Sequence, residues 1–290
     1  MTTHQFKVPA TSANLGPGFD SIGLALEKFL YIEASESEQW EIRFQDDFLK
    51  VLPDDETNLV IETAIGTARK YGLEMPPLRI FMGSEIPLTH GMGSSASAIV
   101  AGIELANHFC GLNLSEFEKV LRGSEIEGHP DNVGPSVTGG LFVGYYKDDE
   151  LFYNTLDLDG LEIIMSVPDY EIDTKAARGV LPEMYPKEDA VDQNAISNAL
   201  LMSMFAKDFR SMGRLMMKDR LHEPYRRELI REYEPIRQAA LGAGAYATVI
   251  SGAGPTLMTV CDRTDSVRVL ESLKSVPDCI HECIRIYKKI

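Results

Sequence analysis

Apolar side chains recur three and four positions apart in three segments of the first half of the chain, a spacing typical of helices with one buried face. It predicts helices over 58–71, 94–109 and 115–127. Ser115 and Glu118 form a capping box at the start of the third segment, which indicates that a helix begins there.

Short apolar or alternating runs predict strands around these helices. In the first half they cover 4–10, 29–36, 40–44, 78–82, 140–146, 151–156 and 162–167. The second half has a helical block at 188–242, strands at 246–250 and 256–260, a helix at 265–274 and a last strand at 281–288. This order predicts an α+β protein with two domains, 1–160 and 161–290.

The composition is that of a globular protein, with 44% hydrophobic and 25% charged residues among 290. Asp and Glu number 44 against 28 Lys and Arg, so the net charge is −16. A surface of that sign repels phosphate backbones and anionic lipids, so we expect neither a nucleic-acid partner nor a membrane partner. No apolar segment approaches the ~20 residues of a membrane-spanning helix.

The chain start lacks the basic and apolar regions of a secretory signal, and the cysteines fit neither a disulfide framework nor a paired zinc site. Cys279, His281 and Cys283 are close in sequence, but the alternation of apolar and polar residues after them indicates a strand rather than a metal site. We therefore expect a reduced, cytoplasmic enzyme.

A glycine-rich segment at 87–97 joins a predicted strand to a strongly periodic helix. Gly91 and Gly93 allow positive φ and a close approach of the backbone to a ligand. Ser94 and Ser95 fall at the start of the helix, where free N–H groups and the helix dipole favour phosphate. Their hydroxyls add donors and a candidate magnesium ligand.

The segment alone admits three interpretations. It could be a serine-capped helix after a flexible turn, or a dinucleotide fingerprint, because Gly91-x-Gly93-x-x-Ala96 has the required spacing. It could also be a nucleotide phosphate loop of a type other than Walker A. The fingerprint is a weak match because five residues separate Glu85 from Gly91 and because the next element, 115–127, is a helix.

Two further strings contain polar residues suited to a site. Pro-Ala-Thr-Ser-Ala-Asn-Leu-Gly-Pro-Gly-Phe-Asp, at 9–20, is longer than a turn needs. In Glu-Gly-His-Pro-Asp-Asn, Glu127 and the preceding Glu125 lie at a helix C-terminus, where the dipole disfavours carboxylates. A bound cation would reverse that penalty, although a solvated glutamate is the simpler alternative.

A second small-residue loop, Ser-Gly-Ala-Gly-Pro at 251–255, lies between two predicted strands. With 9–20 and 87–97 it resembles, in order and spacing, the three motifs of the GHMP kinase superfamily, over nearly the whole chain. The 9–20 string and Glu-Gly-His-Pro-Asp-Asn resemble the homoserine kinases within it. The resemblance implies a two-domain fold, with an N-terminal domain like the second domain of ribosomal protein S5 and a ferredoxin-like C-terminal domain.

The resemblance also implies roles for individual residues. ATP would lie near Asn58 with its phosphates over the loop, and Ser94 and Glu127 would hold Mg²⁺. The nucleotide-binding loop would then comprise Pro87, Leu88, Thr89, His90, Gly91, Met92, Gly93, Ser94, Ser95, Ala96 and Ser97. The substrate would be L-homoserine, bound by Asn14, Asp20, His129, Asn132, Thr174, Arg178, Arg226 and Gly252.

The catalytic residues implied are Asp20, Glu127 and Ser94, acting in transfer of a phosphoryl group from ATP to the homoserine hydroxyl during threonine biosynthesis. The resemblance further implies a homodimer. Mevalonate kinase, or another kinase of small alcohols, is the nearest alternative. A nicotinamide-dependent oxidoreductase, and a non-catalytic binding protein on the same scaffold, are more distant ones.

Overall fold

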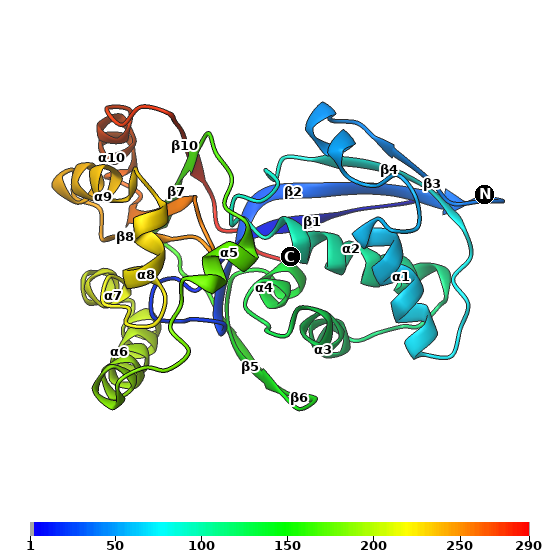
Figure 1. Ribbon diagram of the computed structural model, residues 1–290, viewed down its shortest axis with the longest axis horizontal. Helices are drawn as coiled ribbons and strands as arrows, with labels where there is room; N and C mark the ends of the chain where they lie inside the picture. The colour runs from blue at the N-terminus through cyan, green and yellow to red at the C-terminus, as the bar shows by residue number, and fades with distance from the viewer. Residues whose placement is uncertain (1–2, 290) are drawn as a thin grey trace.

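A computed structural model describes residues 3–289, and within that range ten strands form two sheets flanked by helices (Figure 1). The first sheet has the order β3-β4-β2-β5-β6, with β1 paired to β2 beside this path. Its strands are β1 (His4–Ala13), β2 (Ile22–Glu36), β3 (Glu41–Phe44), β4 (Leu78–Ser84), β5 (Leu141–Lys147) and β6 (Glu150–Leu156). A short 3₁₀ helix, η1, covers Asp47–Val51.

Four helices pack below strands β1, β2 and β4 as they are drawn in Figure 1. They are α1 (Leu59–Lys70), α2 (Ser94–Phe109), α3 (Glu116–Glu127) and α4 (Val133–Thr138). Helix α2 contacts β1 and lies between α1 and α3. Helices α1 and α2 pack closely because Gly102 has no side chain. A Cβ at this position would lie only 2.5 Å from the Val60 carbonyl oxygen. Packing on three sides fixes the N-terminal end of α2, on which the site depends.

The second sheet is antiparallel and has the order β10-β7-β9-β8. Its strands are β7 (Leu161–Pro168), β8 (Ala247–Ile250), β9 (Leu257–Asp262) and β10 (Cys279–Ile284). In chain order this is strand arrangement 4-1-3-2, which is the order of a ferredoxin-like sheet. The predicted division of the chain at 160/161 falls between β6 and β7, and it stays a prediction.

Helices cover both faces of the second sheet (Figure 1). The helices after β7 are α5 (Thr174–Gly179), α6 (Lys187–Phe205), α7 (Phe209–Met216), α8 (Glu223–Arg226), η2 (Arg227–Leu229) and α9 (Tyr233–Gly242), and α10 (Ser266–Leu273) follows β9. Ile164 and Leu257 pack with α9 and α10 in one core cluster, whereas Met165 and Met258 join α6 and α7 in the cluster that continues into the first sheet. This shared core fixes the two halves of the chain against each other.

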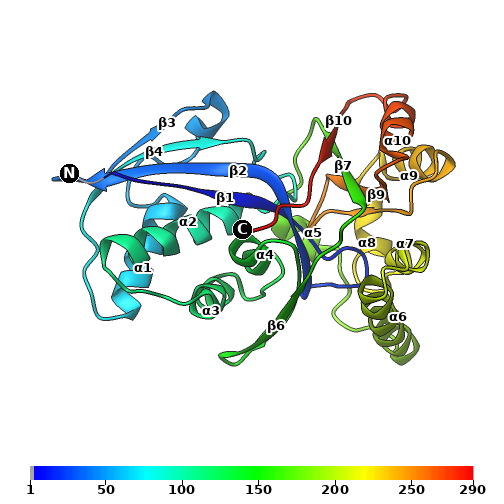
Figure 2. The same ribbon diagram turned by 180° about the vertical axis from the view of Figure 1, so that it is seen from behind.

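The end of the described chain returns to the first sheet (Figure 2). The expected strand 281–288 is wrong in its bounds, because β10 ends at Ile284. Beyond it, Ile286 bridges to Leu26 and Lys288 bridges to Gly139, so these residues pair with the first half of the chain.

Helices α1, α2, α3 and α10 begin and end within a residue of their predicted limits, whereas β1 and β2 extend three and seven residues beyond theirs. Residues 11–13 of β1 and 22–26 of β2 were missed because they are buried without alternation. The helical block at 188–242 divides into α6, α7, α8, η2 and α9. Helices α4 and α5, six residues each, were not expected.

Within the described residues, no helix is both long and apolar enough to cross a bilayer. The four cysteines are free thiols. His281 lies in β10, where its Nδ1 is 2.9 Å from the Ser166 hydroxyl and its Nε2 is 3.3 Å from the Val276 carbonyl oxygen. Both ring nitrogens therefore have protein partners.

Candidate active site

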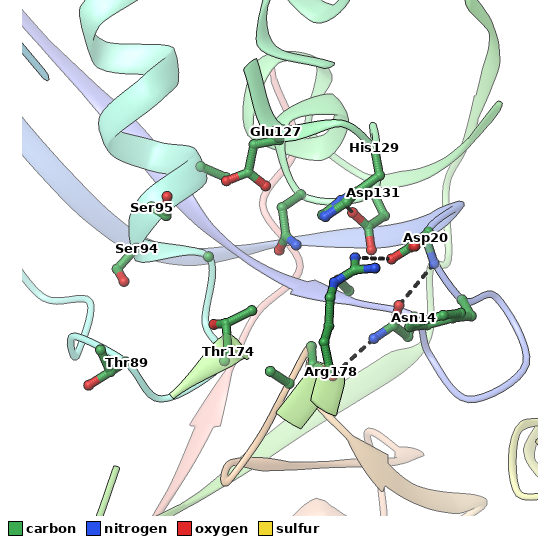
Figure 3. A pocket seen from close by; sticks show the side chains of 18 of the residues that line it. Asn14, Asp20, Thr89, Ser94, Ser95, Glu127, His129, Asp131, Thr174 and Arg178 are labelled. Carbon is green, nitrogen blue, oxygen red and sulfur yellow. Dashed lines mark hydrogen bonds and ion pairs between the residues drawn. The ribbon is translucent and has the colours of Figure 1, made fainter. Parts of the chain in front are cut away.

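A cavity of about 400 Å³ lies where the two halves of the chain meet (Figure 3). The loop after β1, the start of α2, the end of α3, helix α5 and the loop after β8 all contribute to it. It brings together every residue that the sequence assigns to the amino acid, the metal and catalysis: Asn14, Asp20, Ser94, Glu127, His129, Asn132, Thr174, Arg178, Arg226 and Gly252.

The glycine-rich loop forms one wall of this cavity. Gly93 has φ +72° and is the N-cap of α2, and Ser94 is the first helical residue. Gly91 has φ +74°, and its carbonyl accepts a hydrogen bond of 2.7 Å from the Ser251 hydroxyl. A Cβ at Gly91 would lie 2.2 Å from the Ser251 carbonyl oxygen, so only glycine fits. Ser94, Ser95 and Ala96, whose N–H groups lie in the first turn of α2 and have no partner within the helix, line the cavity.

The members of the loop differ in what they contact. Thr89, Gly91, Gly93, Ser94, Ser95 and Ala96 line the cavity, whereas Leu88 and Ser97 line a neighbouring one. Pro87, His90 and Met92 line neither. Met92 is a core residue, 1% exposed, and its carbonyl accepts a hydrogen bond from the Thr11 amide. The assignment of these three residues to nucleotide binding therefore stays a prediction.

The neighbouring cavity is about 380 Å³ and mainly apolar, and it shares Thr89, Ser94 and Ser95 with the first. Leu49 and Leu52 are among its walls. Asn58 also lines it, but its side chain is engaged in capping: Oδ1 accepts from the Val60 amide and Nδ2 donates to the Pro53 carbonyl. An apolar cavity of this size beside the start of α2 suits a planar nucleobase.

Two glutamates at the end of α3 face different surroundings. Glu125 pairs with Lys70 and, at 3.1 Å, with Arg122, and it does not line the cavity. Glu127 lines the cavity close to Ser95 (Figure 3). Burial raises the pKa of Glu127, and the positive charge of His129 only partly offsets that. A carboxylate held in this environment is stabilised by a cation.

His129 is ion-paired with a buried acid. Its Nδ1 lies 2.5 Å from Oδ1 of Asp131, which is 1% exposed. Burial alone would lower the pKa of His129, but the hydrogen bond and charge of Asp131, with Asp20 and Glu127, raise it to about 9. The ligand atoms of His129, Asp131 and Asp20 lie within 4.8 Å of one another. The short contact with Asp131 favours the protonated imidazole, so His129 and Asp131 form an ion pair.

Asp20 is held by residues from both halves of the chain. Its backbone N–H donates to Oδ1 of Asn14 at 3.1 Å, and its carboxylate accepts a 2.8 Å hydrogen bond from Arg178. Nδ2 of Asn14 donates to the Gly252 carbonyl at 2.9 Å. The loop after β1, α5 and the loop after β8 thereby meet around one carboxylate (Figure 3).

The two arginines differ in exposure. The Arg178 side chain is 44% exposed, whereas Arg226 is 2% exposed and donates to the carbonyls of Ala177 and Gly252 at 3.1 Å each. Burial, together with the charge of Arg178, lowers the pKa of Arg226. Thr174, the first residue of α5, lies beside them. Two guanidinium groups at one end of a small cavity suit a carboxylate ligand.

Two family models match this sequence: the N-terminal domain of GHMP kinases over residues 58–140 and the C-terminal domain over 199–278. A homoserine kinase from Staphylococcus aureus (strain MSSA476) is 43% identical over 97% of this chain and 94% of the relative. The chain belongs to the homoserine kinase family of GHMP kinases. The resemblance stated from the sequence motifs is confirmed.

Solved structures of this superfamily share the fold. A putative homoserine kinase from Listeria monocytogenes superposes with a TM-score of 0.83 at 36% identity, covering 98% of this chain and 96% of the other. A mevalonate kinase from L. major, solved with R-mevalonate, has a TM-score of 0.75 at 16% identity, with 99% and 98% covered, which shows the fold alone. The two-domain GHMP kinase fold expected from the sequence is confirmed.

Four residues that line the cavity escaped the sequence reasoning for this homoserine kinase family member: Ala13, Phe19, Asp131 and Ala253, of which Asp131 and Phe19 have side chains with polar or aromatic contacts there. Asp131 stands inside Glu-Gly-His-Pro-Asp-Asn, two positions after His129, and that short spacing was a usable signal for an ion pair. Phe19 also lines the cavity, with the guanidinium carbons of Arg178 and Arg226 5.7 and 5.2 Å from its ring centroid. An aromatic residue beside Asp20 carried no such signal, because its partners come from distant helices.

Proposed function

We propose that this protein transfers the γ-phosphoryl group of ATP to the side-chain hydroxyl of L-homoserine, giving ADP and O-phospho-L-homoserine. The observation that carries the proposal is one cavity lined by the start of helix α2, three acidic side chains and two arginines. Family membership supports ATP as the phosphoryl donor. The product would serve threonine biosynthesis.

In the proposed complex the nucleobase occupies the apolar cavity beside Asn58, and the triphosphate runs over residues 91–97. The N–H groups at the start of α2 and the hydroxyls of Ser94 and Ser95 donate to its phosphate oxygens. Gly91 and Gly93 hold this part of the loop in the left-handed region, which fixes where these donors lie. Such preorganised donors stabilise charge that shifts between oxygens during phosphoryl transfer.

The residues at the start of α2 and the end of α3 fit Mg²⁺. Ser94 and Glu127 offer the hard oxygen ligands that Mg²⁺ prefers, and one or two protein ligands suffice beside water and phosphate. When bound, Mg²⁺ neutralises charge on the phosphate oxygens. The raised pKa of Glu127 supports its assignment as the ligand, because a carboxylate disfavoured by burial gains from a nearby cation. Glu125 is already engaged by Lys70 and Arg122.

The amino acid is proposed to lie between the loop after β1 and helix α5. Arg178, Arg226 and Thr174 receive its carboxylate, and Gly252 closes one side. Asn14, His129 and Asn132 surround the rest of the molecule. Asn132 is fixed for this role, because its Oδ1 accepts a 2.8 Å hydrogen bond from the Thr11 hydroxyl, which leaves its Nδ2 as the donor for the substrate.

Asp20 is proposed to orient the substrate hydroxyl in line with the γ-phosphate. Phosphoryl transfer has a loose transition state in which positioning contributes more than early removal of the proton. A carboxylate already bonded to Arg178 is a fixed acceptor, which suits orientation. The hydroxyl proton then passes to a phosphate oxygen.

A homodimer in the cytoplasm belongs to the same proposal. The family resemblance supports the dimer, and four free thiols agree with a reducing compartment. The oxidoreductase alternative is disfavoured because β4 ends at Ser84, well before Gly91, and α2 is followed by α3 rather than by a strand.

The test is ADP release from ATP and Mg²⁺ with a panel of alcohols: L-homoserine, mevalonate, galactose and shikimate. We expect turnover with homoserine to exceed that with each other alcohol at least 100-fold in kcat/KM. Glu127→Gln, assayed in parallel, excludes a contaminating kinase. Turnover confined to mevalonate would transfer the assignment to that alcohol, and tight NADH binding without ATP binding would overturn kinase activity altogether.

A further inference from the structure

The loop that carries Asp20 has an unfavourable backbone conformation. Asn14, Leu15, Gly16 and Asp20 have φ of +73°, +49°, +77° and +55°. For residues other than glycine the left-handed region is costly, most of all for a bulky residue such as Leu15. A loop of this kind keeps its shape only if the surrounding structure holds it.

The partners that hold the loop come from the second half of the chain. Gln193 Nε2 and the Ser197 hydroxyl, both on α6, donate to the Pro17 carbonyl at 2.9 and 2.7 Å. His222 Nε2, just before α8, lies 2.9 Å from the Gly16 carbonyl oxygen. Two successive carbonyls of the loop are therefore bound by side chains that are distant in sequence.

His222 also contacts Arg226, a residue proposed to bind the substrate carboxylate. Its Nδ1 lies 3.4 Å from Nη1 of Arg226. A carbonyl can only accept and a guanidinium can only donate, so the imidazole joining them is neutral with its proton on Nε2. Burial, the largest effect on this side chain, lowers the pKa of His222 and agrees with the neutral form. Both ring nitrogens are thus used, one for the loop and one for Arg226.

The ring of His222 makes a third contact with the same loop. It stacks on Phe19, with centroids 5.1 Å apart and planes at 17°. Phe19 is the neighbour of Asp20 and lines the cavity. His222 itself is fully buried, and its backbone N–H donates to Oδ2 of Asp219 at 2.8 Å. Asp219 in turn accepts a hydrogen bond from Gln193, so the loop and its supports form one network.

We propose that His222 is a positioning residue for phosphoryl transfer: it holds the 14–20 loop and Arg226 in register, so that Asp20 and the carboxylate-binding arginines face the same substrate. It does not line the cavity and touches no reacting atom. The inference rests on the proposed function, since it assigns Asp20 and Arg226 to the amino acid. The inference goes beyond the proposed function because it makes binding of the amino acid, and not binding of ATP, depend on a buried histidine in the second half of the chain.

The test compares His222→Phe, which keeps a ring against Phe19 but loses both hydrogen bonds, with His222→Gln, whose amide can still donate to Gly16 and accept from Arg226. For His222→Phe we expect kcat/KM for homoserine to fall about 100-fold, because a buried carbonyl and a buried guanidinium lose a partner. KM for ATP should stay within about twofold. His222→Gln should recover about tenfold of the loss.

Thr248→Val is the matched control, because Thr248 is buried in β8 and pairs with the Thr259 hydroxyl, away from the loop. It should lower the Tm and leave kcat/KM for homoserine within about twofold. Parallel losses for both substrates, or a His222→Gln enzyme no better than His222→Phe, would overturn the proposal. If His222→Phe does not fold, Ser197→Ala replaces it: a several-fold rise in KM for homoserine alone is expected, and no rise contradicts the proposal.

Failure of the proposed function is separable from failure of this inference. A wild-type enzyme that does not turn over homoserine refutes the substrate assignment. The same split between KM for ATP and KM for whichever alcohol is phosphorylated then tests His222. A wild-type enzyme active on homoserine, with unchanged kinetics in His222→Phe, refutes the positioning role only.

Discussion

The side chains of Asp20 and Arg178 form an ion pair 2.8 Å long, although 158 positions separate them and they belong to different halves of the chain. Arg178 is 44% exposed, so such a pair contributes little to stability. Its effect is geometric: the pair fixes the Asp20 carboxylate, which faces the hydroxyl of the proposed substrate, and it orients the Arg178 guanidinium beside that carboxylate. The site exists only when both halves have folded and met.

Asp20→Asn tests whether this carboxylate orients the hydroxyl or removes its proton. An amide of the same shape keeps a hydrogen-bond acceptor but cannot take a proton, so we expect kcat to fall by about 10- to 100-fold with the shape of the pH–rate profile preserved. Steady-state rates between pH 5.5 and 9 provide the measurement. Loss of the acidic limb together with a fall of several decades would instead identify Asp20 as a general base.

Glu127→Gln and Glu125→Gln form a matched pair on the same helical turn. Glu127→Gln should lower kcat about 100-fold or more and raise the Mg²⁺ concentration needed for half-maximal rate, because a charged oxygen ligand is lost. Glu125→Gln should cost about 1.5–3 kcal/mol of stability, because its charge-assisted hydrogen bonds with Lys70 and the mostly buried Arg122 are weakened, and should leave kcat within twofold. Mg²⁺ titrations of both variants decide, and the reverse pattern would move the metal to Glu125.

The sequence predicted the elements that depend on local pattern. Helix α2 covers 94–109 as its periodicity indicates, and the capping box at Ser115 begins α3, because both signals lie within a few residues of the feature they mark. The last strand was misplaced because residues 285–289 pair with the first sheet, a long-range contact that no local pattern encodes. Buried segments such as 22–26 lack alternation for a similar reason: both of their faces are covered.

Gly91→Ala and Gly72→Ala separate a steric effect from a conformational one. Both glycines have positive φ, +74° and +73°, but only at Gly91 would the Cβ meet another atom, the Ser251 carbonyl oxygen at 2.2 Å. Gly72→Ala should cost only the backbone penalty, about 1 kcal/mol, with normal kinetics. Gly91→Ala should lower the free energy of unfolding by more than Gly72→Ala does. It should also raise KM for ATP at least tenfold, because residues 87–97 must shift to clear the Ser251 carbonyl oxygen. Denaturant unfolding and ATP titrations test both, and equal behaviour would contradict the role of the contact between the two loops.

The ion pair of His129 and Asp131 predicts loss of stability at alkaline pH. The folded pKa of His129 is about 9 and the unfolded value is near 6.5, so the stabilisation is complete below pH 6.5 and disappears as the pH rises through 9. His129→Asn keeps a donor for Asp131 without the charge. We expect the free energy of unfolding of the wild type to decline across this window and that of the variant to decline less.

The measurement is urea unfolding at pH 6, 7, 8 and 9. Burial raises the pKa of Glu223 to about 8, whereas the pKa of this carboxyl in the unfolded chain is 4.5. The free energy of unfolding therefore also falls as the pH rises from 4.5 to 8, because the buried carboxyl disfavours ionisation. Its contribution is the same in both proteins and cancels in the comparison. Parallel curves for wild type and His129→Asn would show that His129 is not a cation at neutral pH.

Site residues could be predicted where a single sequence motif contains them. They could not be predicted where the side chains that hold them come from distant parts of the sequence. Asn14, Asp20 and His129 stand in recognisable strings, and the structure gathers them around one cavity. The supports of these residues come from α6 and from the segment before α8, and nothing near Gln193 or His222 in the sequence points to the loop after β1. Such contacts follow from the packing of the two halves, which only the three-dimensional structure reveals.

The most direct test of the central claim is a crystal structure of the complex with a non-hydrolysable ATP analogue, Mg²⁺ and L-homoserine. We predict the triphosphate on the amides of residues 91–97, the metal at Glu127 and Ser94, and the homoserine hydroxyl between Asp20 and the γ-phosphate with its carboxylate at Arg178 and Arg226. A triphosphate bound elsewhere, with the start of α2 contacting only solvent, would contradict the account.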